Sequence, residues 1–319
     1  MQRYLSNPIV RSLLAIARPF VVNRKVTVGL VVVLFFVVVA IIGPLFIRTS
    51  PNAISDDLMA PPSLAHPLGT TYVGQDVLSQ VVYGSQISLL VGFGAGLVTT
   101  IVSVFVGLIS GYFGGWIDEV LSLISNVFLV LPTLPLAIVL AAFLPRSGVF
   151  SIGFVIVVTG WSWGARVLRA QTLSMRNRDF VEASRASGEG WFRIVFFEVF
   201  PNESAIVAAE LLGTVIYSIL AEAGLEFLGL GDISNVSWGT MFYWASNNDA
   251  LLQGAWWWII PPGLCIALLG AGLAFVNFGM DEIANPRLRT EPKLRVPKSK
   301  APTEIEDTST DHIPAVEVS

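Results

Sequence analysis

The sequence predicts an all-α integral membrane protein with six transmembrane helices. Three observations predict this fold class: an apolar composition, six apolar runs of membrane-spanning length, and an uneven distribution of lysine and arginine. Hydrophobic residues make up 54% of the 319 residues and charged residues only 13%. Soluble globular domains have about 25% charged residues, so the composition excludes that class.

Each apolar run is long enough to cross about 30 Å of hydrocarbon as a helix that rises about 1.5 Å per residue. The first run follows 25 other residues and is not followed by a small-residue cleavage site, so it is predicted to be an uncleaved anchor rather than a signal peptide. The predicted spans are residues 26–47, 86–110, 120–144, 150–172, 204–225 and 256–279.

The orientation follows from the basic residues, which resist translocation and collect on the cytoplasmic side. Of the nineteen lysines and arginines, five precede the first span, six surround the connection between the fourth and fifth spans, and six follow the sixth. The other two, Arg48 and Arg146, lie in segments that we expect to be external. Both termini and the segment 173–203 are therefore predicted to be cytoplasmic.

The chain divides where its composition changes. Residues 1–25 are a predicted cytoplasmic segment, 26–47 the first transmembrane helix, and 48–85 an external segment rich in proline, aspartate and serine. Residues 86–280 form a five-helix core that includes the cytoplasmic segment 173–203. The tail 281–319 contains five prolines and turns from basic to acidic. It is expected to be disordered, with its basic part against anionic lipid headgroups.

Few residues suited to catalysis or metal binding are present. The single cysteine, Cys265, lies in an apolar run, and the two histidines, His66 and His312, are far apart, so neither a disulfide nor a Cys/His metal site is expected. The chain contains no Gly-Lys dipeptide and hence no P-loop. We expect a protein that is not an enzyme, has no catalytic residues, metal or cofactor of its own, and binds no nucleic acid.

The segment 173–203 has helical charge spacing in an otherwise apolar chain. Glu182, Arg185 and Glu189 recur at i, i+3 and i+7, and Gly188 supplies a helix-stop signal. The mostly apolar residues 191–200 predict a second short helix, which ends where Pro201 opens the next span. Such a helix pair can lie in the membrane interface, cap its own bundle or insert into a partner; composition alone favours the first two.

Small residues and prolines mark helix packing within the spans. Glycines four residues apart allow helix backbones to approach closely in lipid. Two prolines inside the third span predict a kink. The residues concerned are Gly92, Gly96, Gly107, Gly111 and Gly115, and Pro132 and Pro135.

Carboxylates inside spans are costly and suggest function. Glu210 lies in the fifth span, and Glu222 and Glu226 lie one helical turn apart near its outer end. These groups could line a translocation path, or they could bond to loop groups at the membrane interface. The second reading is favoured for Glu222 and Glu226, although Glu222 is kept with Glu210 as a candidate for the path.

Several motifs resemble one family. Glu182-Ala183-Ser184, Gly188 and Pro201 resemble the EAA loop of the membrane permeases of binding-protein-dependent ABC importers. The likeness is greatest to the dipeptide/oligopeptide permease C-type branch and covers roughly residues 20–290 in family order. Its further motifs are HPLGT at 66–70, GQDVLS at 74–79, YGSQISL at 83–89, GYFGGW at 111–116, FLGLG at 227–231, SWG at 237–239 and NPRLR at 285–289.

This resemblance implies the architecture and partners of a type I ABC importer permease. Such a permease works by alternating access as a heterodimer with a second permease subunit, over two cytoplasmic ATP-binding subunits that hold the ATP and Mg, and with an external substrate-binding protein. The external segments 48–85 and 226–255 are candidates for contact with that protein, although their tryptophans are equally typical of a bilayer interface. The expected location is the inner or plasma membrane, among its lipids.

The resemblance also implies roles for individual residues. Glu182, Ala183, Ser184 and Arg185 would lie in a docking helix that couples to the ATPase, Gly188 would make the corner after it, and Pro201 would begin the return into the membrane. Serine replaces the alanine expected at 184 and keeps the small volume.

The expected substrate rests only on the branch of the family that the motifs resemble. Dipeptides and oligopeptides are favoured, with oligosaccharides or nickel as alternatives, because selectivity resides largely in the external binding protein. A rival of a different class is an ion-coupled secondary transporter. That rival needs paired ionisable residues near mid-membrane, and only Glu210 hints at them.

Overall fold

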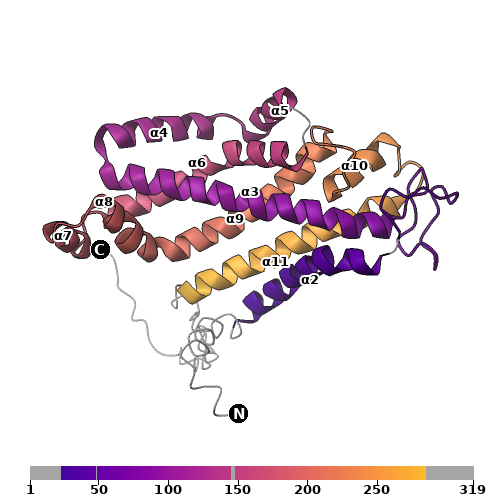
Figure 1. Cartoon of the computed structure of the whole chain (residues 1–319), viewed down its shortest axis with the longest axis horizontal. Coiled ribbons are helices and arrows are strands. Elements are labelled where there is room, and N and C mark those ends of the chain that lie inside the picture. The colour runs from indigo at the N-terminus through magenta and orange to yellow at the C-terminus, as the bar shows by residue number, and fades with distance from the viewer. Residues whose placement is uncertain (1–22, 48, 145–147, 285–319) are drawn as a thin grey trace, which may run out of the picture.

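The structure, a computed structural model, describes residues 23–47, 49–144 and 148–284. Long helices lie side by side, the short helices α7 and α8 lie at one end of the bundle, and the irregular segment before α3 lies at the other (Figure 1). The elements are α2 (Arg24–Phe46), α3 (Val77–Phe113), α4 (Gly115–Val130), α5 (Thr133–Phe143), α6 (Val149–Met175), α7 (Asp179–Ala186), α8 (Trp191–Arg193), the π-helix η2 (Ile194–Val199), α9 (Phe200–Phe227), α10 (Trp238–Asn247), the 3₁₀-helix η3 (Trp256–Trp258) and α11 (Ile260–Ala284).

The described helices confirm the predicted membrane protein. Five helical segments are long and apolar enough to span a membrane, and the count is six if α4 and α5 form one bent span. The five are Arg24–Phe46, Val77–Phe113, Val149–Met175, Trp191–Phe227 and Trp256–Met280. The predicted segments 1–25 and 281–319 lie mostly outside the described residues, as do Arg48 and Arg146.

Helix α3 begins earlier than predicted, at Val77 instead of residue 86. Asp76 caps it, since its carboxylate accepts a hydrogen bond of 2.7 Å from the amide of Ser79. The helix has 37 residues. At about 1.5 Å per residue it is roughly 55 Å long and extends well beyond about 30 Å of hydrocarbon.

The third predicted span is sharply bent. A single kinked helix over 120–144 was expected, whereas α4 and α5 meet at an angle of 94°. Leu131 is extended, with φ −68° and ψ 130°, because the ring of the following Pro132 disfavours helical geometry at the residue before it. Pro135 lies in the first turn of α5, where a missing amide hydrogen costs no helical bond.

The connection between α6 and α9 differs from the predicted pair of short helices. Helix α7 ends at Ala186 as expected, but α8, η2 and α9 form one continuous helical run from Trp191 to Phe227. Pro201 is therefore the second residue of α9 inside that run and does not follow a break. The wider π turn of η2 precedes it and makes room for a ring that would otherwise clash with the preceding turn.

Glycines bring the central helices into close contact, as predicted for four of the five named above. An added Cβ at Gly107 would lie 2.7 Å from the Cβ of Leu168, and one at Gly111 would lie 2.6 Å from that of Thr172, so α3 packs tightly on α6. Gly92 and Gly96 bring α3 equally close to α9. Gly115 is the exception: it begins α4 with φ +53° and open space around its Cβ position, so it serves a turn.

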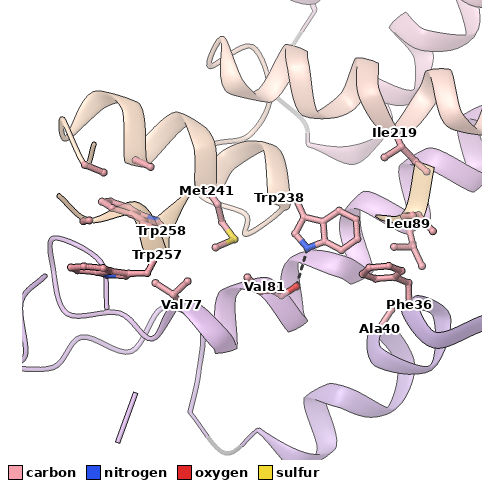
Figure 2. Packing of buried hydrophobic residues seen from close by; sticks show 14 of the residues in the cluster. Phe36, Ala40, Val77, Val81, Leu89, Ile219, Trp238, Met241, Trp257 and Trp258 are labelled. Carbon is pink, nitrogen blue, oxygen red and sulfur yellow. Dashed lines mark hydrogen bonds between the residues drawn. The ribbon is translucent and has the colours of Figure 1, made fainter. Parts of the chain in front are cut away.

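The largest buried cluster joins α2, α3, α9, α10 and α11 (Figure 2). Trp238 at the start of α10 packs edge-on against Phe36 of α2, with ring centroids 5.7 Å apart. Its indole N–H donates a 3.0 Å hydrogen bond to the carbonyl of Val81. The indole ring is thus packed against apolar neighbours, and its one polar atom has a hydrogen-bond partner.

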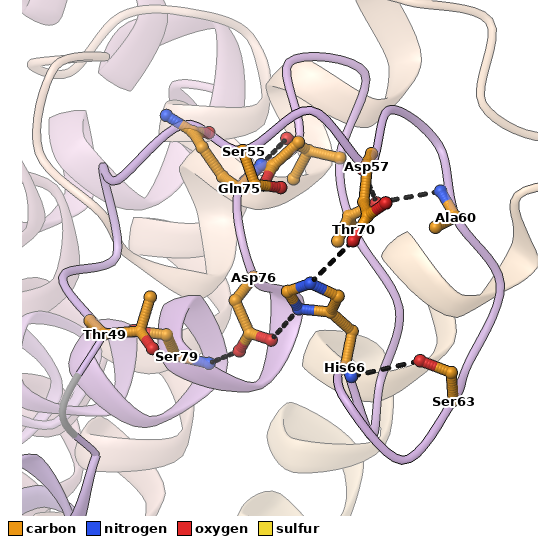
Figure 3. Close-up of polar contacts among 12 residues, drawn as sticks. Thr49, Ser55, Asp57, Ala60, Ser63, His66, Thr70, Gln75, Asp76 and Ser79 are labelled. Atoms are coloured by element: carbon orange, nitrogen blue, oxygen red, sulfur yellow. Dashed lines mark hydrogen bonds and ion pairs between the residues drawn. The ribbon is translucent and has the colours of Figure 1, made fainter.

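The irregular segment before α3 is held by polar contacts (Figure 3). His66 Nδ1 lies 2.8 Å from a carboxylate oxygen of Asp76, and its Nε2 lies 3.5 Å from one of Asp57. The Thr70 hydroxyl donates to the carbonyl of Asp57 and accepts from the amide of Ala60. These bonds tie the HPLGT motif to the N-cap of α3, so its residues have a structural role.

Candidate functional site: the bundle cavity and the α7 segment

A cavity of about 930 Å³ opens among the membrane-spanning helices. It is lined by residues of α4, α5, α6, α9 and α11. Two of these helices, α6 and α9, are the ones that precede and follow α7 in the chain. Small residues on α9 leave the space open. The lining residues are Phe128, Leu129, Thr133, Thr159, Gly160, Ser162, Trp163, Val167, Ala205, Ile206, Ala209, Glu210, Gly213, Thr214, Tyr217, Asn277 and Met280.

Glu210 is the one acidic or basic side chain among the described residues that line this cavity. It is 8% exposed and accepts a weak hydrogen bond of 3.4 Å at Oε1 from the Thr214 hydroxyl. Gly164 of α6 makes room for it, because an added Cβ there would lie 1.9 Å from Oε1. Its second oxygen, Oε2, has no hydrogen-bond partner, and no basic side chain pairs with it, among the described residues.

Uncharged polar groups line the same cavity as Glu210. The hydroxyls of Thr159 and Tyr217 lie 3.4 Å apart on α6 and α9. Asn277 of α11 lines the same cavity, and its amide oxygen is buried without a hydrogen-bond partner. A cavity with one acid, several hydroxyls and aromatic rings can hold a polar solute while most of its wall remains apolar.

Glu222 does not line the cavity, in contrast to its place among the predicted path residues. It is fully buried and accepts a 3.1 Å hydrogen bond from the Ser88 hydroxyl on α3. Glu226 accepts from the hydroxyl of Ser237, which also caps α10 through the amide of Thr240. The two glutamates therefore join α9 to α3 and to the start of α10, because their hydrogen-bond partners come from those elements.

Two polar contacts were not foreseen from the sequence. Arg169 of α6 and Asp118 of α4 form a two-pronged ion pair with N–O distances of 2.5 and 2.7 Å. Glu203 of α9 is buried and accepts 2.9 Å from the hydroxyl of Thr172 on α6. A carboxylate and an arginine in successive apolar helices were the available signal for the first pair.

The pentapeptide Gly160-Trp161-Ser162-Trp163-Gly164 matches the GxSxG pattern of hydrolase nucleophile elbows. That elbow is a strained turn between a strand and a helix. Here the pentapeptide lies inside α6, and Ser162 has a regular helical neighbourhood. The pattern match is therefore coincidental. Among the described residues, no group of three or more His, Cys, Asp or Glu side chains is arranged to hold a metal ion.

The predicted docking residues lie on α7, which projects at one end of the bundle (Figure 1). Glu182, Ala183 and Arg185 are exposed and Ser184 is half-buried. Val181 anchors the helix from its other face, fully buried in a cluster of α3, α6 and η2 residues. The guanidinium of Arg185 lies 5.0 Å from the ring centroid of Tyr112.

Gly188 ends the turn after α7. Its φ is +81°, in the left-handed region that glycine adopts without strain, and nothing lies near its Cβ position. Glu189 and Arg193 form an ion pair of 2.9 Å across the next turn. The chain thus reverses at 187–190 and enters the run that becomes α9.

Residues 103–290 match the model of the family described as "Binding-protein-dependent transport system inner membrane component". The chain belongs to this family. Residues 12–65 also match a second model, "N-terminal TM domain of oligopeptide transport permease C". The family description places the chain in the inner membrane, and the resemblance inferred from the motifs is confirmed.

Named relatives are similar to this chain over most of their length. The dipeptide transport system permease protein DppC of Bacillus subtilis (strain 168) is 35% identical over 275 residues, which cover 84% of this chain and 83% of the relative. The oligopeptide transport system permease protein OppC of Lactococcus lactis subsp. cremoris (strain SK11) is 32% identical, over 74% of this chain and 81% of the relative. A putative peptide permease of Brucella suis biovar 1 is 34% identical, over 88% and 92%.

The fold of the chain described here also matches a solved structure. A chain of the MetNI methionine ABC transporter in an inward-facing conformation superposes with a TM-score of 0.52 and 19% identity, over 66% of this chain and 96% of that one. At this identity the match concerns the fold alone. It confirms the predicted type I importer permease fold.

Proposed function

We propose that this chain is a membrane subunit of an ATP-driven importer of dipeptides and oligopeptides. The named relatives are peptide permeases, and both family models cover parts of this chain. The cavity suits such substrates, because a peptide offers both polar backbone groups and apolar side chains. Oligosaccharides and nickel find no comparable support.

One observation carries the proposal: α7 is an exposed helix placed directly between two helices that line the cavity. It follows α6 after Met175 and leads through the turn at 187–190 into the run of α9. A force applied to Glu182, Ala183, Ser184 and Arg185 therefore reaches both cavity walls through short connections. Val181 fastens α7 to the bundle, so the helix does not swing freely when it is pushed.

The proposed partners follow from this arrangement. Two cytoplasmic ATP-binding subunits would bind ATP and Mg and contact α7. A second permease subunit would form a heterodimer with this chain and complete the cavity. An external binding protein would deliver peptides at the opposite end, near the segment 49–76 and helix α10, which contains Trp244. Both termini and α7 would then be cytoplasmic. This agrees with the distribution of basic residues.

The proposed mechanism is alternating access. Closure of the ATP-bound subunits would bring the docked α7 helices together and open the paired bundles toward the loaded binding protein. Hydrolysis would release them and open the cavity to the cytoplasm. The chemical step belongs to the ATPase, and this chain supplies the path and the mechanical link.

The substitution Gly188→Leu tests the link. A leucine at φ +81° is strained by about 1–2 kcal/mol and shifts the turn that follows α7. We expect the complete importer to assemble but to lose its substrate-stimulated ATP hydrolysis. Gly190→Leu is the matched control, because Gly190 has φ −71° and open space around its Cβ position. Unchanged stimulation in an assembled Gly188→Leu importer would remove the coupling role.

A further inference from the structure

The geometry points to Glu210 as a binding site for an ammonium group of the transported peptide, inside the membrane cavity. This inference rests on the proposed function and adds to it. The site would favour peptides with a free amino terminus or a lysine side chain and disfavour acidic peptides. The permease, as well as the external binding protein, would thus discriminate between peptides by their charge.

The charge of the cavity supports this inference. Glu210 is the one charged side chain among the described lining residues, and its Oε2 has no partner. The basic residue Arg166 of α6 lines a separate pocket of about 190 Å³ with residues of α3 and α4. A single carboxylate in a mostly apolar cavity attracts cations more strongly than the same group would in water.

Other groups that line the cavity also suit an ammonium group. An ammonium has three N–H donors and no acceptor, so it needs several oxygen atoms. Glu210 Oε2, the unpaired amide oxygen of Asn277 and the hydroxyl of Tyr217 come from α9 and α11 around the same cavity. The exposed ring of Trp163 on the facing helix α6 can add a cation–π contact.

The carboxylate is also held in place. Thr214 and the helix surface at Gly164 restrict Glu210, and a side chain at 164 would occupy the position of its Oε1. A fixed acceptor binds a ligand with less loss of side-chain entropy than a mobile one does. A peptide carboxylate, by contrast, would find no basic partner among the described lining residues.

The test uses the complete importer in proteoliposomes, with saturating binding protein and ATP. The probes are tri-alanine, its N-acetylated form, and tripeptides with a central lysine or glutamate. For Glu210→Gln we expect the uptake ratio of the lysine peptide to the glutamate peptide to fall about tenfold relative to wild type, a change typical of losing one charge-assisted contact. Because the binding protein is the same in both, its own selectivity cancels in the comparison. Acetylation of tri-alanine should slow uptake by wild type more than by the variant.

The matched control is Glu203→Gln, the same substitution on the same helix at a residue outside the cavity lining. It should leave the uptake ratio unchanged, and Glu210→Asp should largely keep it. Asn277→Leu should lower the uptake ratio to a smaller degree. This variant tests the ammonium site if the Glu210→Gln importer does not assemble. Uptake of tri-alanine with an unaltered charge ratio in these variants would overturn the ammonium site alone. No ATP-dependent uptake of any peptide by wild type would overturn the proposed function itself.

Discussion

The carboxylates in the described membrane-spanning helices differ in what their oxygen atoms contact. Asp118 accepts hydrogen bonds from Arg169, Ser110 and Ser122, so its charge is balanced and its oxygens are occupied. Glu222 and Glu226 are bonded to hydroxyl groups inside the subunit. Glu210 alone combines a place on the cavity wall with an oxygen that has no partner. A contact with the substrate is therefore expected at Glu210, and packing roles at the others.

Removing one partner of the Asp118–Arg169 pair should destabilise the protein. The side chains are 16% and 33% exposed, so the loss should lie below that of a fully buried pair, at about 1–3 kcal/mol for Asp118→Asn or Arg169→Gln. We expect a lower apparent Tm of the purified complex and less protein in the membrane. The double variant should lose less than the sum of the two single variants.

Glu119→Gln is the control for this cycle, since Glu119 is the exposed neighbour of Asp118 on α4. It should leave the apparent Tm unchanged. Additive losses in the double variant would mean that the two groups do not depend on each other and that the short distances overstate their coupling.

Among the elements, α3 and α6 form the contact that the rest of the bundle is arranged around. Their backbones approach at Gly107 and Gly111, where lipid provides no hydrophobic drive and close packing must hold the helices together. The ion pair of α6 with α4 lies close to this contact, since Ser110 of α3 also bonds to Asp118. Three helices, α3, α4 and α6, are thus connected at one place.

The substitution Gly107→Ala should weaken the α3–α6 contact. Its methyl group would lie 2.7 Å from the Cβ of Leu168 and 2.8 Å from the carbonyl oxygen of Ala165, so the helices must move apart. Such overpacking costs about 1–3 kcal/mol, which we expect to see as a lower apparent Tm. Gly94→Ala, on the same helix with nothing near its Cβ position, is the control. Equal apparent Tm values for the two variants would mean that the close approach carries no stability.

The sequence predicts where helices cross the membrane better than where they begin, bend or end. Apolar runs locate the spans, but α3 begins at Val77 because the cap at Asp76 decides the start and the apolar composition does not. Pro132 predicts a break, whereas the angle of 94° depends on where α5 packs, with Ala137 and Ala141 buried against Ile152 and Val155 of α6. A proline in one sequence carries no information about that packing.

At the scale of the whole molecule, contacts between distant residues decide what composition leaves open. Ser88 and Glu222 are 134 residues apart, and Asp118 and Arg169 are 51 apart. Helical spacing shows which face of a helix is polar but not which other helix that face meets. The segment that resembles the EAA loop could be recognised from sequence because its residues are close together in the chain. Glu222 is the opposite case, because its hydrogen-bond partner Ser88 lies on another helix, α3, and helical spacing alone could not identify it.

The orientation of the whole molecule is the premise on which coupling depends. Helix α7 and the segment before α3 lie at opposite ends of the bundle (Figure 1), so one faces the cytoplasm if the other faces outward. The distribution of basic residues predicts that α7 faces the cytoplasm. Because the chain has one cysteine, Cys265, a Cys265→Ser background permits site-specific labelling at a single introduced thiol.

Ala65→Cys and Asn177→Cys place exposed thiols at the two ends. In right-side-out membrane vesicles, a membrane-impermeant maleimide should label Ala65→Cys at once, and Asn177→Cys only after detergent opens the vesicles. The Cys265→Ser background should stay unlabelled in both conditions. Labelling of Asn177→Cys in sealed vesicles would place α7 outside the cell, where no ATP-binding subunit can reach it. The coupling role would then be lost even if the cavity and its carboxylate behaved as proposed.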